Sequence, residues 1–85
     1  MTAKERLAEA GYEDIIIFEN CYDDALIGVS HDERAIYDFD KMVEYLVEKE
    51  GFTDEEAIEW IEFNTLRALP YFGEKAPIIL YRLEE

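Results

Sequence analysis

The chain has 85 residues, of which 49% are hydrophobic and 14% aromatic, and its 22 acidic and 8 basic side chains give a formal net charge of −14. So short a chain must place most of its apolar side chains in one core, which predicts a single ordered domain over residues 1–85. The negative charge disfavours direct binding to nucleic acid or to an anionic membrane, since both depend on cationic side chains.

The first eleven residues predict a short helix. Thr2 and Glu5 have the spacing of a capping box, and Gly11 is the residue type that follows a helix in the left-handed conformation. We do not expect this start to be a signal peptide, and no apolar run approaches the roughly 20 residues of a membrane span. The one cysteine, Cys21, cannot form an intramolecular disulfide, which indicates a reducing setting. We therefore expect a soluble, cytoplasmic protein.

Three strand-like runs follow the first helix. The β-branched run "DIIIFE" (14–19) and the run "ALIGVS" (25–30) read as the arms of a hairpin. The alternating run "AIYDF" (35–39) extends them into an antiparallel meander. Gly28, inside the second run, indicates a bulge.

Two helices and a last strand complete the expected fold. Asp38 or Asp40 can cap a helix through "KMVEYLVEKE" (41–50), which ends at Gly51. A second capping box, Thr53 with Glu56, begins a helix that continues to about residue 69, just before a proline. The run "IILYRL" (78–83) reads as the final strand. The sequence thus predicts an α+β, two-layer domain of order αβββααβ, with a mostly antiparallel sheet packed by a helical hairpin.

No residue pattern indicates catalysis, a metal or a cofactor. Ser30, His31 and Asp32 are consecutive in a predicted turn, whereas a catalytic triad assembles from distant segments and needs an oxyanion hole. The acidic pairs near residues 23 and 38 supply too few ligands for a cation, and no glycine-rich phosphate loop is present. We therefore expect a protein that is not an enzyme, with no catalytic, cofactor-binding or metal-binding residues.

The acidic side chains concentrate on the predicted helical hairpin. Between residues 40 and 62 stand nine acids and two lysines, about half of the net charge. On helical wheels the carboxylates form one row on each helix, opposite the apolar stripe, and Trp60 and Phe63 flank the second row. We expect the following residues to bind a partner: Asp40, Glu44, Glu48, Glu55, Glu59, Glu62, Trp60 and Phe63. Asn64 falls within the apolar stripe, where we expect it to be buried and paired with the backbone of the loop after residue 70.

The C-terminal half, from "FDKMVEYLVEKEGFTDEEAIEWIEFNTLRALPYFGEKAPIIL" onward, resembles a group of small acidic proteins of unassigned function from Firmicutes and their phages and mobile elements. The segment "NTLRALPY" is the most distinctive part of this resemblance. It implies a setting and no mechanism. Small acidic proteins from that setting include anti-CRISPR and DNA-mimic inhibitors, which is an analogy of size, charge and source.

Two functional hypotheses follow from the sequence. In the first, the protein is a non-enzymatic interaction protein that presents its carboxylates to a basic, nucleic-acid-binding partner protein, and a phage-type (anti-CRISPR or DNA-mimic) inhibitor is its concrete version. In the second, it is a bacterial accessory domain that acts structurally or as a regulator, through homodimerisation or an apolar patch, and its acidity serves solubility only.

Overall fold

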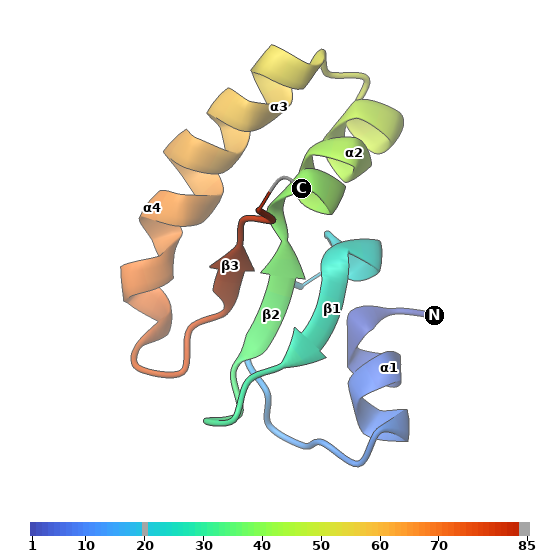
Figure 1. Ribbon diagram of the computed structural model, residues 1–85, viewed down its shortest axis with the longest axis vertical. Helices are drawn as coiled ribbons and strands as arrows, with labels where there is room; N and C mark the ends of the chain where they lie inside the picture. The colour runs from blue at the N-terminus through green and yellow to red at the C-terminus, as the bar shows by residue number, and fades with distance from the viewer. Residues whose placement is uncertain (20, 84–85) are drawn as a thin grey trace.

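The computed structural model describes residues 1–19 and 21–83 and confirms the α+β class (Figure 1). A three-stranded sheet of order β1-β2-β3 is formed by β1 (Leu26–Val29), β2 (Ala35–Asp38) and β3 (Ile78–Leu80). The helices are α1 (Ala3–Glu9), α2 (Phe39–Glu50), α3 (Asp54–Trp60) and α4 (Leu66–Ala68). Among the described residues, no helix has both the length and the apolar character that crossing a membrane requires.

Helix α1 begins and ends as the sequence predicts. The Thr2 hydroxyl accepts from the Glu5 N–H at 3.2 Å, and the Glu5 carboxylate accepts from the Thr2 N–H at 2.9 Å. Gly11 follows the helix with φ of +89°. Asp23 anchors the helix start, because its carboxylate accepts from the Ala3 N–H and its carbonyl accepts from Arg6.

The run at residues 14–19 is not a strand, so that prediction is wrong. Asp14 and Tyr22, on either side of it, have left-handed φ angles of 61° and 60°. These backbone reversals are incompatible with continuous strand pairing. The Phe18 N–H donates to the Tyr37 hydroxyl at 3.2 Å instead of to a neighbouring strand. The apolar residues of the run are buried or half-buried against the core. β-propensity alone does not distinguish such burial from strand pairing.

The sheet is mixed, which corrects the expectation of a mostly antiparallel one. β1 and β2 form an antiparallel hairpin, with a register shift between Leu26 and Gly28, where the sequence predicts a bulge or a close backbone approach. β3 instead pairs parallel to β2. The chain leaves β2 through the helices and returns in the same direction, which is the crossover that a parallel pair requires.

The helical hairpin confirms the predicted caps. The Asp38 carboxylate caps α2 by accepting from the Lys41 N–H, and Gly51 ends the helix with φ of +71°. Thr53 and Glu56 form the second capping box at the start of α3. Figure 1 shows α2 and the helical segment from α3 through α4 running in opposite directions from the turn between them. That segment contains a π-helical turn, η2 (Ile61–Thr65), and ends in a 3-10 turn, η3 (Leu69–Phe72), with Pro70 in its first turn.

Tyr37 lies at the centre of the core and is fully buried. Its ring packs against Phe18 with centroids 4.8 Å apart, and its hydroxyl accepts the Phe18 N–H described above. Burial raises the pKa of Tyr37 to about 12. The neutral phenol is therefore the form that the fold accommodates.

Stability should depend on this phenol at alkaline pH. The pKa of Tyr37 is raised above its unfolded value of about 10, so its contribution is complete below pH 10 and is lost as pH rises to about 12. Replacing Tyr37 with Phe should cost about 1–3 kcal/mol at neutral pH, because the Phe18 N–H loses its acceptor. The variant should also show a shallower alkaline fall. Urea unfolding of the wild type and of the Tyr37→Phe variant across this pH range measures how the free energy of unfolding falls. An equally steep fall in both proteins would contradict the assignment.

Candidate functional site

The predicted carboxylate rows are exposed on the outer faces of the helical hairpin. On α2, Asp40, Glu44 and Glu48 lie opposite the buried side of the helix. The α3 and η2 segment carries the second exposed row, which consists of Glu55, Glu59 and Glu62. Each row repeats at helical spacing, so adjacent carboxylates of one row are about 6 Å apart at their bases.

Most of this charge has no ion-pair partner among the residues that the structure describes. In residues 1–19 and 21–83, the carboxylate of these rows that forms an ion pair is Asp40, which lies 3.5 Å from Arg82. Arg82 also pairs with the buried Asp38 at 2.9 Å. Across the same residues no ion pair joins a basic side chain to the other five members of the two rows. In the described part of the chain, no basic side chain therefore lies at ion-pair distance from these five carboxylates to reduce their negative potential.

The two flanking aromatics are half-exposed rather than buried. Trp60 is 46% exposed and packs against Phe52, in the turn between the helices, with ring centroids 5.7 Å apart. Phe63 is 60% exposed and lies beneath the Arg67 guanidinium, 5.0 Å from its ring centroid. Both rings thus offer apolar area beside the second carboxylate row.

The expected burial of Asn64 is wrong. Asn64 is exposed, and its amide donates to the Trp60 carbonyl at 3.1 Å instead of to the loop after residue 70. The reason is the π-turn, in which the Leu66 N–H reaches back five residues to the Ile61 carbonyl. Each residue of a π-turn advances by a smaller angle than in an α-helix. Asn64 therefore stops short of the core, and Thr65 takes the buried position.

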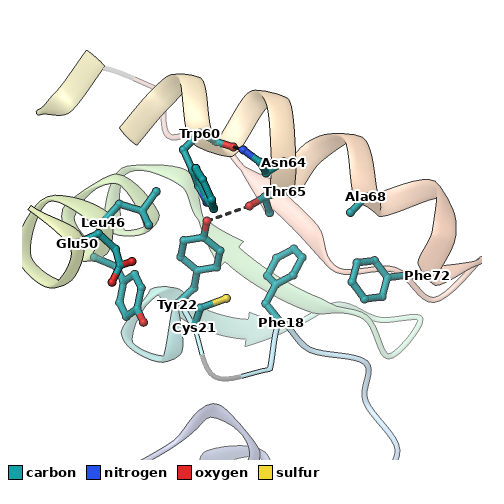
Figure 2. A pocket seen from close by; sticks show the side chains of 11 residues that line it. Phe18, Cys21, Tyr22, Leu46, Glu50, Trp60, Asn64, Thr65, Ala68 and Phe72 are labelled. Carbon is teal, nitrogen blue, oxygen red and sulfur yellow. Dashed lines mark hydrogen bonds between the residues drawn. The ribbon is translucent and has the colours of Figure 1, made fainter. Parts of the chain in front are cut away.

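A cavity of about 390 Å³ opens beside Trp60, and it was not predicted from the sequence. Its walls come from Phe18, Cys21 and Tyr22, from the C-terminal half of α2 and from the inner side of the α3 to η3 segment (Figure 2). Five aromatic side chains line it: Phe18, Tyr22, Tyr45, Trp60 and Phe72. One wall can be read from the sequence, because three of its residues are spaced four apart: Trp60, Asn64 and Ala68. The other walls come from segments that are distant in the chain.

Both long walls of this cavity depart from regular backbone geometry. Tyr22 adopts φ of 60°, a left-handed conformation that is rare for a large side chain and costs about 1–3 kcal/mol. The facing wall is the π-turn, a feature frequent at functional sites. One hydrogen bond joins them, between the buried hydroxyls of Tyr22 and Thr65 at 2.9 Å. Figure 2 shows this bond with Trp60 directed toward the same hydroxyl.

The cysteine and serine side chains that could act as nucleophiles lie in different surroundings. Burial, and secondarily Asp23, raises the pKa of the Cys21 thiol, so the reactive thiolate is disfavoured. Ser30 bonds to Asp32 within the exposed turn of the β1–β2 hairpin. In the described part of the chain, no three His, Cys, Asp or Glu side chains are grouped to hold a metal.

Comparison of the chain with protein-family models, with curated proteins and with solved structures gives no match. The functional argument therefore depends on the two surfaces described above.

The bond between Tyr22 and Thr65 should hold the two walls of the cavity together. Either Tyr22→Phe or Thr65→Val leaves a buried hydroxyl unpaired and should cost about 1–3 kcal/mol. The double variant should cost less than the sum of the two single changes, because neither hydroxyl remains. Urea unfolding of the four proteins gives the coupling energy, for which we expect about 0.5–1.5 kcal/mol. Additive losses would show that the bond contributes nothing.

Proposed function

We propose that this protein is a non-enzymatic inhibitor that binds a basic, nucleic-acid-binding protein through the outer faces of α2 and α3. The proposal depends on one observation about the two carboxylate rows. Five of their exposed carboxylates lie at helical spacing and have no ion-pair partner in the described residues. Like charges in such rows destabilise the helices that carry them. A cationic partner relieves that repulsion on binding. The complementary potential also speeds the encounter of the two proteins and fixes their relative placement.

The spacing of the rows supports a partner whose own ligand is nucleic acid. Carboxylates about one helical turn apart, on two antiparallel helices, approximate the spacing of several Å between phosphates along a nucleic-acid strand. A groove lined with Lys and Arg for phosphate contacts would accept such a surface in place of its substrate. Inhibition of a nuclease by occupying this groove, as in an anti-CRISPR protein, is the concrete form of the proposal.

Charge reversal at three positions tests the electrostatic premise. The combined variant Glu44→Lys, Glu48→Lys and Glu59→Lys should abolish capture of basic proteins, yet it should raise the free energy of unfolding by relieving repulsion. The matched control is Glu9→Lys, Glu13→Lys and Glu74→Lys, which changes the net charge equally at exposed positions outside the hairpin. The control should retain binding.

The measurement is affinity capture from a bacterial lysate with the three proteins at low salt and at about 0.5 M NaCl. For the wild type and the control, we expect nucleic-acid-binding proteins that are released by salt and by added duplex DNA. Equal capture by the hairpin variant, or capture that neither salt nor DNA reverses, would overturn the proposal.

A second candidate function is supported by the apolar side chains beyond β3. Tyr81 and Leu83 are exposed where β3 forms an edge of the sheet. A homodimeric accessory domain could bury them, with the acidity serving solubility only. Sedimentation distinguishes the two, because dimerisation through this edge would persist at high salt, whereas binding of the basic partner in the first proposal is weakened by salt.

A further inference from the structure

We propose that the aromatic cavity between α2 and the α3 to η3 segment receives the side chain of one arginine from the basic partner. This inference rests on the proposed function for the source of the arginine, but the cavity and its chemistry stand independently of it. The carboxylate rows would then orient the partner, and the cavity would anchor it.

The shape of the lining favours a flat cation. Tyr22 is steeply inclined to both Phe18 and Tyr45, with centroids 5.7 and 5.4 Å away and interplanar angles of 77° and 60°. Phe72 meets Phe18 at 77° on the other side. Because neighbouring rings are inclined rather than stacked, they enclose the space from several directions. Aromatic faces attract cations through the ring quadrupole, and guanidinium groups also stack on them.

The charge at the cavity favours a cation over an apolar side chain. Glu50 lines it and is exposed, and among the described residues it has no ion-pair partner. Figure 2 places Glu50 at the α2 end of the row of rings. A second hollow, lined in part by Glu56 and Glu59, shares Trp60 with the cavity. Glu50 and Glu59 thus each line a hollow that Trp60 also lines.

Arginine fits these features better than lysine. Its guanidinium is more weakly hydrated than an ammonium, so it loses less on entering a largely apolar space, and its paired N–H donors match one carboxylate. The cavity volume of about 390 Å³ is at the small end of the range for ligand sites, roughly 300–1,000 Å³, and suits one side chain. The Tyr22 hydroxyl is already bonded to Thr65, which leaves Glu50 as the charged acceptor.

Trp60 is the single tryptophan of the chain, and it reports directly on this cavity. We would titrate the protein with N-acetyl-arginine methylamide and follow Trp60 fluorescence and the indole N–H signal in NMR spectra. A saturable change with a Kd on the order of 1 mM is expected for so small a ligand. The citrulline analogue, which has nearly the same shape without the charge, should bind at least several-fold more weakly.

Two variants assign the binding to this cavity. Glu50→Gln should weaken arginine binding about two- to fivefold, as expected for one partly exposed charge pair. Glu9→Gln, at an exposed position outside the hairpin, should leave it unchanged. Both positions are exposed, so neither change threatens the fold. Equal affinity for arginine and citrulline, equal weakening by both variants, or no saturable change would overturn the inference.

This experiment uses no partner protein, so its outcome is separate from that of the capture experiment. Failure of arginine binding with retained, salt-sensitive capture would remove the anchor and leave the inhibitor proposal. Arginine binding without capture would support the cavity assignment and overturn the inhibitor proposal.

Discussion

Repulsion among the exposed carboxylates of α2 and α3 is the constraint that the rest of this structure must offset. Both helices carry like charges at a spacing that weakens them. The fold opposes this locally with caps: Asp38 and Gly51 at the ends of α2, and the Thr53 capping box at the start of α3. Each cap contributes about 1 kcal/mol, which exceeds the few tenths that one like-charge pair costs. The helices can therefore keep an outer face that contributes nothing to their own stability.

The inner side of the same helices supplies the remaining stabilisation. Met42 and Leu46 of α2, and Ala57 and Ile61 of the second helical segment, are buried in one core cluster that also contains Phe18, Tyr22 and Tyr37. The π-turn adjusts this packing by placing Thr65 against Tyr22 and leaving the cavity beside Trp60. One pair of helices thus carries the charge on its outer face and cavity-lining rings on its inner face. The surface proposed for binding and the packing of the core therefore depend on the same two helices.

The helices were largely predictable because their signals are local. The capping boxes at Thr2 and Thr53, the aspartate cap of α2 and the glycine that ends it are all read from a few neighbouring residues. So are the exposed carboxylate rows, which follow from helical periodicity. The strand runs at residues 26–29 and 35–38 were also recognisable from their apolar pattern.

The errors arose where distant segments decide the structure. The run at 14–19 is apolar because it covers the core, and nothing local shows that the backbone turns left-handed at Asp14 and Tyr22. The parallel placement of β3 depends on the path of the helical segments between β2 and β3. Periodicity assumed regular α-helical rotation through residues 61–65, whereas the π-turn leaves Asn64 exposed. The cavity combines three segments that are distant in the chain, so no single stretch of sequence could reveal it.

The most direct test of this account is the salt dependence of stability. If the hairpin carboxylates repel one another without internal counterions, the free energy of unfolding of the wild type should rise as NaCl increases from about 0.01 to 0.2 M. Neutralising Glu44, Glu48 and Glu59 to Gln should remove most of that rise, whereas neutralising Glu9, Glu13 and Glu74 should leave most of it. A wild-type stability that is constant or falls with salt would show that these carboxylates are already compensated within the protein and would contradict the account.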